Sequence, residues 1–441
     1  MKNDLTNSTG GFQNRVGFIL ASVGSAVGMA NIWMFPYRLG QNGGAAFLIV
    51  YLFFIALFSN VGLSAEFAVG RFSGTGTLGA YEKAWSDKKK GKIGLGLGTI
   101  PLAGSMGIAI GYAIISAWVL RTFVGTVTGD LFKVESAEFF AQATGAFGSL
   151  PWHIIIVVGT LMTLIMGAKS IEKSNKILMP VFFILFILIA IRVAFLPGAM
   201  MGYKYLFVPD WSYLAKPMTW VNAMGQAFFS LSITGSGMIV YGTYLGKGED
   251  IISVSRYTGI FDTIAAIISA LVVIPACFAF GMEPGAGPPL MFITIPKVLE
   301  QMPMGRIIAV FFFLSVVFAA VSSLQNMFEA VAESIQNRFG LSRIVGIIIL
   351  AIISLVIGIF IEAEPKVGPW MDIVSIYIIP FGALLGAFTW FFIWDKNKFK
   401  AELESGREKP ISERYFAMGK FLYVPLAVVI FVLGIIFGGI G

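Results

Sequence analysis

Cysteine, histidine and charged side chains are scarce in this chain of 441 residues. Cys277 is its only cysteine and His153 its only histidine. A single cysteine excludes an intrachain disulfide, a CxxC redox pair and a cysteine-rich metal site. Only 12% of the residues are charged, whereas 57% are hydrophobic. This composition is typical of repeated bilayer-length helices rather than of a soluble core, so we predict an all-α integral membrane protein.

The formal net charge of +7 does not indicate a nucleic-acid partner. Lys and Arg lie in a few short segments between apolar runs, and not on a patch with base-stacking aromatic side chains. Basic clusters at 83–92 and 396–414 follow the second and tenth apolar runs and predict two cytoplasmic loops. This assignment puts the N-terminus in the cytoplasm and the C-terminus outside.

Hydropathy predicts eleven transmembrane helices within a single membrane domain over residues 1–441, with an uncleaved N-terminus. The predicted spans are 15–39, 44–70, 96–125, 151–168, 174–197, 220–245, 256–281, 305–336, 342–361, 368–394 and 418–440. The proline-rich segment 283–304 is too irregular to span, and we expect an outer loop there, with a short helix that covers an entrance.

The first span is interrupted in its middle, where residues 24–31 read GSAVGMAN and Pro36 follows. Unpaired backbone groups are costly in hydrocarbon, so a broken helix survives where its free carbonyls face a cavity or an ion. Asn31 and the nearby carbonyls offer hard oxygen ligands suited to an alkali cation. Gly24 and Gly28 are also four residues apart, as in close helix packing. These residues alone leave both interpretations open.

A second break interrupts the sixth span, where residues 230–237 read SLSITGSG. The two breaks correspond if the chain has two five-helix repeats, over 12–197 and 218–394, with 418–440 as an additional helix. An odd number of spans per repeat inverts the second copy, which is the plan of secondary transporters with broken helices at the midplane. Serine and glycine are also common packing residues, but two matching breaks favour function over packing.

Acidic residues inside the predicted spans are expensive, and such groups are usually paired or functional. We interpret Glu66 as an acceptor for the free N–H groups of a broken neighbouring helix. Asp262 lies deep in an apolar run and is the better candidate ion ligand. We interpret His153, beside Trp152, as an interfacial side chain.

The sequence has none of the catalytic motifs considered below. No nucleophile and base pair stands out, and no HExxH motif occurs. Residues 242–248 (GTYLGKG) do not fit a phosphate-binding loop, because Lys247 is followed by glycine. We therefore expect neither an enzyme nor an organic cofactor.

The ordered set of motifs resembles the neurotransmitter:sodium symporter family, specifically its bacterial amino-acid transporters. The similarity covers residues 24–36, the QNGGAAF run at 41–47, Glu66 with 70–72, the second break and the serines at 322–323. It implies a leucine-transporter-like fold with unwound first and sixth helices, in the bacterial cytoplasmic membrane. It also implies sodium-coupled import of a neutral L-amino acid by alternating access.

The resemblance implies two sodium sites. Its first site is formed by Ala26, Asn31, Ser230 and Asp262, and its second by Gly24, Val27, Ala319, Ser322 and Ser323. Asp262 stands where the family has an asparagine. Because its carboxylate fixes a negative charge beside the first sodium ion, we expect transport without chloride.

The resemblance also implies the substrate site. Gly28 leaves room for the substrate carboxylate, whereas members that transport biogenic amines have an aspartate there. Gly235 aligns with a pocket phenylalanine of the leucine transporter, which favours a bulky hydrophobic or aromatic substrate such as tyrosine or tryptophan. The implied substrate residues are Ala26, Gly28, Met29, Ile108, Tyr112, Phe229, Ser230, Ser232, Thr234, Gly235, Ser323, Asn326 and Met327.

Several positions depart from the family pattern. Met34 replaces the usual outer-gate arginine, so we expect Trp33, Gln226 and Asp372 to gate, with Glu66 in support. Phe12 stands where a tryptophan is common. A substrate-gated cation channel or sensor on the same scaffold is the alternative function, and no residue pattern indicates an oligomeric state.

Overall fold

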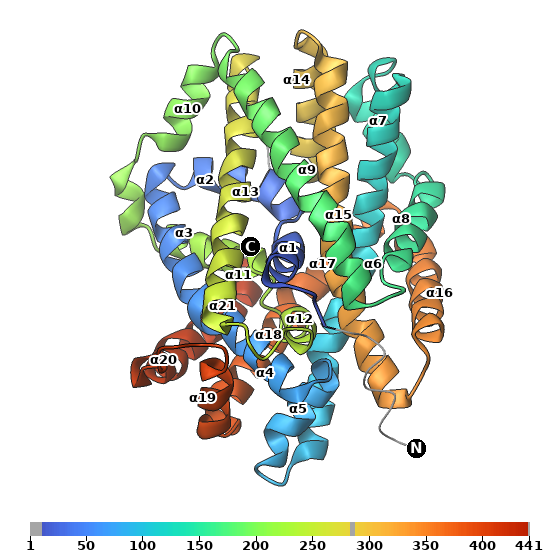
Figure 1. The fold of residues 1–441 in the computed structure, drawn as a ribbon. Helices are drawn as coiled ribbons and strands as arrows, with labels where there is room; N and C mark the ends of the chain where they lie inside the picture. The colour runs from blue at the N-terminus through green and yellow to red at the C-terminus, as the bar shows by residue number, and fades with distance from the viewer. Residues whose placement is uncertain (1–10, 283–286, 440–441) are drawn as a thin grey trace.

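The computed structural model describes residues 11–282 and 287–439, and all of its regular elements in these ranges are helices (Figure 1). Residues 1–10, 283–286, 440 and 441 lie outside the described residues. They include the ends of the predicted domain, part of the segment 283–304 and the last residue of the span 418–440.

The described part of the first half of the chain contains ten α-helices. They are α1 (Arg15–Ala26), α2 (Phe35–Gln41), α3 (Ala45–Phe58), α4 (Ser64–Ser73), α5 (Thr77–Ser86), α6 (Gly91–Thr128), α7 (Ser136–Thr144), α8 (Leu150–Met162), α9 (Ala168–Ala194) and α10 (Ala199–Phe207). Wider π-helical turns, η1 (Ala30–Met34) and η2 (Ser59–Leu63), lead into α2 and α4.

The second half repeats this pattern of long helices. It consists of α11 (Pro217–Ser230), α12 (Gly237–Thr243), α13 (Ile251–Ala279), α14 (Ile295–Gln301), α15 (Gly305–Phe339), α16 (Arg343–Ile361), α17 (Glu364–Asp372), α18 (Ile379–Phe388), α19 (Lys396–Glu404), α20 (Glu413–Met418) and α21 (Val424–Phe437). The π-helical turns η6 (Ile373–Ile378) and η8 (Gly419–Tyr423) make continuous spans of α17 with α18 and of α20 with α21.

Each predicted span coincides with helix. Within the described residues, eight helices are long and apolar enough to cross a membrane, and α1 with η1 and α2 adds a ninth that is bent by 61°. The helix α8 has only 13 residues, and α11 and α12 are separate short helices. The total of eleven spans therefore stays a prediction.

Both predicted breaks are present. After α1, Val27 adopts an extended conformation (φ −72°, ψ 107°), so the helix cannot continue into η1. Between α11 and α12, Ser232 and Gly235 have positive φ values of 52° and 74°. The two breaks touch, since Ser232 Oγ donates to the carbonyl oxygen of Ser25 at 3.0 Å. The unwound segments therefore form one region.

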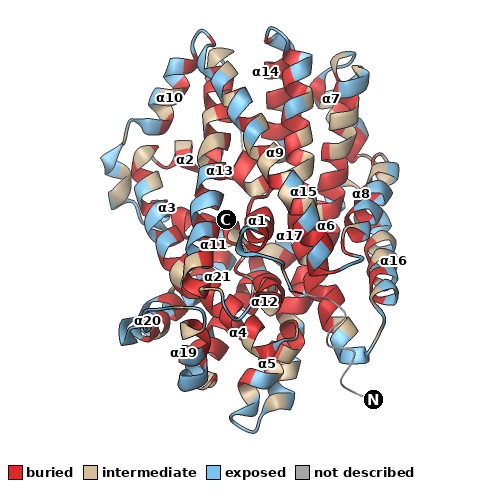
Figure 2. Cartoon of the chain, in the orientation of Figure 1, coloured by how far each residue is buried: buried red, intermediate tan, exposed pale blue. Residues whose placement is uncertain are grey.

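The broken helices lie at the centre of the molecule, with α6, α9, α13 and α15 around them (Figure 1). Figure 2 shows that α1 and α12 are mostly buried, whereas peripheral helices such as α8 and α16 expose much of their surface. The exposed face of α16 is apolar and includes Ile344, Ile348, Ile352 and Val356. An apolar outer surface suits contact with lipid hydrocarbon rather than with water.

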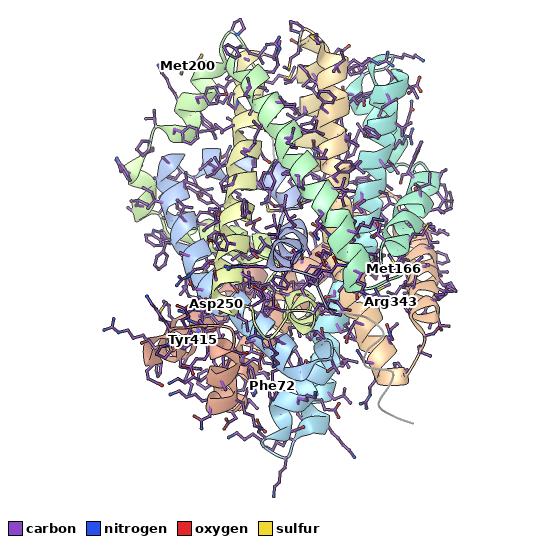
Figure 3. The ribbon with its side chains drawn as sticks, in the orientation of Figure 1. Phe72, Met166, Met200, Asp250, Arg343 and Tyr415 are labelled. Carbon is purple, nitrogen blue, oxygen red and sulfur yellow. The ribbon has the colours of Figure 1, made fainter. Side chains whose placement is uncertain are left out.

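The two basic loops predicted to be cytoplasmic lie at the same end of the molecule, where α5 and α19 meet (Figure 1). Arg71 of α4 fastens this end, because its Nε lies 2.6 Å from Glu402 Oε1 of α19. At the base of α16, Arg343 pairs with buried Glu329 and donates to the carbonyl oxygen of Leu164, close to Met166 (Figure 3).

Two further expectations have different outcomes. The interpretation of His153 as an interfacial side chain is wrong, because this side chain is fully buried between α8 and α16. Gly358 makes this possible, since a Cβ there would lie 2.1 Å from the imidazole. The expected short helix within 283–304 is confirmed as α14, preceded by η5 (Leu290–Thr294).

Candidate substrate and ion site

A cavity of ≈430 Å³ lies where the breaks of α1 and α11 face α6, α15 and α17. Most of the substrate residues implied by the sequence line it. These are Ala26, Gly28, Met29, Ile108, Tyr112, Phe229, Ser230, Ser232, Ser323 and Met327. The structure therefore brings together residues that are as much as 301 positions apart, from four helices.

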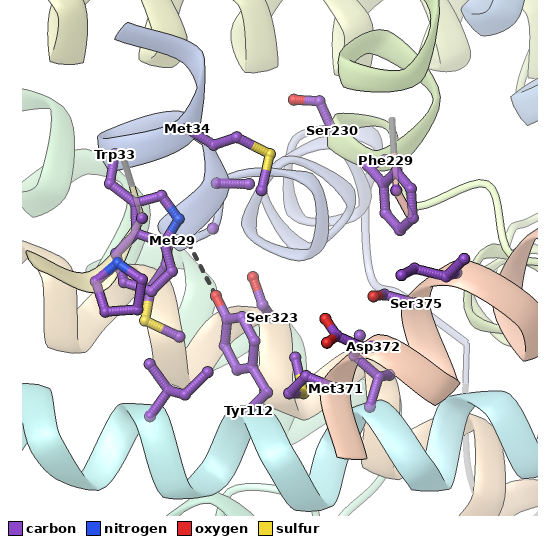
Figure 4. A pocket seen from close by; sticks show the side chains of 18 of the residues that line it. Met29, Trp33, Met34, Tyr112, Phe229, Ser230, Ser323, Met371, Asp372 and Ser375 are labelled. Carbon is purple, nitrogen blue, oxygen red and sulfur yellow. Dashed lines mark hydrogen bonds between the residues drawn. The ribbon is translucent and has the colours of Figure 1, made fainter. Parts of the chain in front are cut away.

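Gly28 lies close to two hydroxyl groups of this site. A Cβ built on Gly28 would lie 2.9 Å from the Tyr112 hydroxyl and 3.0 Å from Ser323 Oγ. The Tyr112 hydroxyl also accepts a hydrogen bond of 3.0 Å from the Met29 N–H, and Figure 4 shows Phe229 on another wall of the cavity. The two hydroxyl groups can donate to a small anionic group, and a Cβ on Gly28 would crowd both of them.

Three implied residues do not line the cavity: Thr234, Gly235 and Asn326. A Cβ on Gly235 would lie 2.5 Å from the carbonyl oxygen of Gly382, so the α18 backbone fills the space beside this glycine. Asn326 Nδ2 donates to the carbonyl oxygen of Gly237 at 2.9 Å. Thr234 and Gly235 belong to the second break, and Asn326 of α15 contacts the residue that follows it.

Three of the four residues implied for the first sodium site, Asn31, Ser230 and Asp262, form a buried polar cluster. Asn31 Nδ2 lies 2.7 Å from Asp262 Oδ1 and 3.2 Å from Ser230 Oγ. Ser230 Oγ donates to Asp262 Oδ2 at 2.7 Å, and Asn31 Oδ1 accepts from the Gly28 N–H at 3.0 Å. The cluster joins α11 and α13 to the first break, directly beside the cavity.

The residues implied for the second site also meet. Ser323 Oγ lies 3.2 Å from the carbonyl oxygen of Val27 and 3.4 Å from that of Gly24. Ser322 Oγ donates to the carbonyl oxygen of Ala319 at 3.0 Å. Both clusters are rich in hard oxygen atoms, and the described residues contain no group of three or more His, Cys, Asp or Glu side chains. Such donors suit an alkali cation better than a transition metal.

Glu66 does what the sequence predicts. Its Oε1 accepts a hydrogen bond of 2.7 Å from the backbone N–H of Gly235, in the unwound segment after α11. Glu66 is buried on α4, so its carboxyl group satisfies a donor that the break leaves without a helical partner.

The gate residues separate into two groups. Trp33 and Asp372 line the cavity, together with Met34 (Figure 4). Gln226 does not, since it is fully buried on α11 and its amide atoms have no hydrogen-bond partner among the described residues. Phe292 of η5 packs against Trp33, with ring centroids 6.5 Å apart, so the outer segment covers this end of the site.

The segment before α1 packs against two other helices. The Phe12 ring contacts the rings of Tyr241 and Tyr244, and its N–H donates to the carbonyl oxygen of Tyr244 at 3.2 Å. The Gln13 N–H donates to buried Glu172 at 2.7 Å. These contacts fasten the start of α1 to α12 and α9.

The sequence interpretation missed Ile115 and Trp118, which also line the cavity. Both follow Ile108 and Tyr112 at helical spacing on α6, so extending that face by two turns identifies them. It also missed Met371 and Ser375, which no sequence pattern distinguishes from their neighbours.

Two unwound helices beside a central cavity are the plan of secondary transporters with broken helices at the midplane. The model of the sodium:neurotransmitter symporter family matches residues 9–144 and 132–437. The chain belongs to this family, which consists of transporters and not of enzymes, and it is a sodium-dependent symporter.

Relatives cover most of the chain. The uncharacterized sodium-dependent transporter YhdH of Bacillus subtilis is 31% identical over 96% of this chain and 97% of its own length. The sodium- and chloride-dependent GABA transporter ine of Drosophila melanogaster is 29% identical, over 74% of this chain and 39% of its own. The crystal structure of MhsT in complex with L-phenylalanine has a TM-score of 0.83 and 31% identity, and the match covers 96% and 99% of the two chains. The predicted leucine-transporter-like fold is confirmed.

Proposed function

We propose that the protein imports a neutral L-amino acid together with two sodium ions, by alternating access. The observation that carries this proposal is the position of Gly28 between the hydroxyls of Tyr112 and Ser323, beside the cluster of Asn31 and Asp262. A carboxylate at Gly28 would accept from the Tyr112 hydroxyl and lie next to the first sodium ion. The amino group of a biogenic amine would find no carboxylate partner at this place, because residue 28 is a glycine.

The side chain of the substrate is bulky and hydrophobic or aromatic. The cavity of ≈430 Å³ has walls of Ile108, Phe229, Met327 and Trp118, and such walls favour apolar side chains. The likeness to MhsT, whose structure was solved with L-phenylalanine, supports the same class of ligand. The hydroxyl groups of the serines at 230, 232 and 323 discriminate between substrates by their polar groups.

Sodium provides the driving force. The first ion binds Ala26, Asn31, Ser230 and Asp262, and the second binds the carbonyls of Gly24, Val27 and Ala319 with the hydroxyls of Ser322 and Ser323. Each positive charge that moves inward down the membrane potential contributes about 2.3 kcal/mol per 100 mV, before any concentration gradient is added. Two ions can therefore concentrate a neutral solute strongly.

Asp262 makes chloride unnecessary. Its carboxylate is fully buried beside Ser230 and Asn31, so a sodium ion there is neutralised by the protein itself. The protein lies in the bacterial cytoplasmic membrane with its N-terminus in the cytoplasm, as the common end of the two basic loops supports. The outer gate is formed by Trp33 and Asp372, which border the cavity.

Thermal unfolding of the purified protein with each of the twenty amino acids tests this function, because a ligand of the folded state raises the apparent stability. We expect phenylalanine, tyrosine or tryptophan to stabilise the protein in NaCl and not in KCl. A stronger effect of glycine or alanine would contradict the substrate class. Counterflow of labelled substrate in proteoliposomes then separates a carrier from a channel or sensor, because only a carrier exchanges substrate.

A further inference from the structure

A buried network of amide side chains borders the second oxygen cluster. Asn175 of α9 is fully buried, and its Nδ2 donates to the carbonyl oxygen of Ile171 at 2.9 Å and to Gln325 Oε1 at 2.7 Å. Gln325 Nε2 in turn donates to Thr163 Oγ1 at 2.7 Å and to Ser174 Oγ at 2.8 Å. This network connects α9 with α15 and with the turn that follows α8.

The network determines which way the Asn175 amide points. Both hydrogens of Gln325 Nε2 have acceptors, so Gln325 presents its oxygen to Asn175. Both hydrogens of Asn175 Nδ2 are then used as well. Asn175 Oδ1 must consequently point away from Gln325, and it has no hydrogen-bond partner among the described residues.

The free oxygen lies against Gly24, one of the residues implied for the second cluster. A Cβ built on Gly24 would lie 2.1 Å from Asn175 Oδ1 and 3.0 Å from Ser322 Cβ. Gly24 provides one of the carbonyls that Ser323 contacts. Asn175 Oδ1 thus approaches the second cluster from α9, on the side that neither the first break nor α15 supplies.

A buried acceptor without a partner is costly, and here a whole network holds it in that state. An amide oxygen is a hard ligand and suits an alkali cation. We propose that Asn175 Oδ1 is an additional ligand of the second sodium site, oriented by Gln325. This inference rests on the proposed function, since it assigns a further residue to one of its two ion sites.

Sodium titration of the purified full-length protein tests the inference. The midpoint of thermal unfolding is followed against NaCl at constant ionic strength without substrate, which yields a half-saturating sodium concentration. We expect Asn175→Leu, which keeps the branched shape and the number of side-chain heavy atoms but removes the oxygen, to raise this concentration roughly fivefold or more. Asn175→Asp keeps an oxygen and adds charge, so we expect an equal or lower value than for the wild type.

Asn222→Leu is the matched control, because Asn222 is a buried asparagine that contacts Arg38 and Asn42, away from both oxygen clusters. It should change the half-saturating concentration by less than about twofold. An unchanged value for Asn175→Leu overturns the inference alone, as does an Asn175→Asp protein that needs more sodium than the wild type. If Asn175→Leu does not fold, the comparison of Asn175→Asp with the wild type tests the inference. A wild-type protein without any sodium response overturns both the inference and the proposed function.

Discussion

Asn31 and Asp262 are 231 positions apart in the chain, and their side chains meet at 2.7 Å between Nδ2 and Oδ1. The contact joins the first break to the middle of α13, and Ser230 Oγ adds a third group at 2.7 Å from Asp262 Oδ2. A carboxylate at this depth is tolerated because polar groups from two other helices surround it. In the proposed function, this carboxylate is the fixed charge of the first ion site.

Replacement of Asp262 with asparagine removes that fixed charge. We expect Asp262→Asn to abolish substrate uptake or to make uptake dependent on chloride, because a mobile anion can then supply the missing charge. Uptake in proteoliposomes measured in chloride and in gluconate distinguishes these states. Wild-type rates for the variant in the absence of chloride would contradict the role of Asp262.

Alanine at residue 28 should weaken substrate binding. The added methyl would lie 2.9 Å from the Tyr112 hydroxyl and 3.0 Å from Ser323 Oγ, where the substrate carboxylate is expected. We expect Gly28→Ala to lower the affinity for the preferred amino acid by roughly tenfold or more, about 1.4 kcal/mol. Ligand-dependent thermal stabilisation measures the change.

Gly96→Ala is the control for this variant, because a Cβ on Gly96 of α6 meets nothing within 4 Å. Its affinity should equal that of the wild type. Equal affinities for the two alanine variants would mean that Gly28 does not border the bound substrate.

Glu66 accepts a hydrogen bond from the backbone of the second break. We expect Glu66→Leu to eliminate substrate binding, because the Gly235 N–H loses its acceptor, and a buried unsatisfied donor costs about 1–3 kcal/mol. Glu66→Gln retains an acceptor oxygen and should recover much of the binding. The prediction fails if the leucine variant binds the substrate as well as the glutamine variant does.

Arg71 should matter for stability rather than for substrate choice. Its guanidinium is nearly fully buried and contacts Glu402, the Glu249 carbonyl and the Gly246 carbonyl. Removal of one partner from a buried ion pair costs about 3–5 kcal/mol, and Lys247, 2.8 Å from Glu402, moderates the loss to the lower end of this range.

The melting temperature of Arg71→Met in detergent measures this loss. Arg338→Met is the control, because its pair with Glu82 is exposed and such pairs contribute about 1 kcal/mol or less. We expect a clear decrease for the first variant and almost none for the second. Comparable melting temperatures would show that the Arg71 contacts do not hold this end together.

The sequence is sufficient for the helical fold and for both breaks, because hydrocarbon imposes strict rules on backbone groups and on hydrophobic length. The partner of Glu66 also follows from these rules. The helix α8, with 13 residues, is shorter than a bilayer-length helix. It packs beside α6 and α16 and does not need to form a full span alone. The buried position of His153 depends on the gap that Gly358 leaves on another helix, which no local pattern shows.

Within the site, residues that the family resemblance places on the cavity wall are largely predictable, whereas contacts made by a helix distant in the sequence are not. Gly28 and Tyr112 line the cavity as expected, whereas Gly235 is blocked by the carbonyl of Gly382, from a helix about 150 positions later in the sequence. The orientation of Asn175 likewise results from Gln325, a partner that only the packing of α9 on α15 reveals. Such contacts are set by tertiary structure.

Uptake of a labelled aromatic amino acid into proteoliposomes, driven by an imposed sodium gradient, is the most direct measurement of sodium-coupled symport. The structure predicts accumulation above the external concentration with sodium outside, in the absence of chloride, and no accumulation when potassium replaces sodium. Simple equilibration of the label, independent of the sodium gradient, would contradict symport.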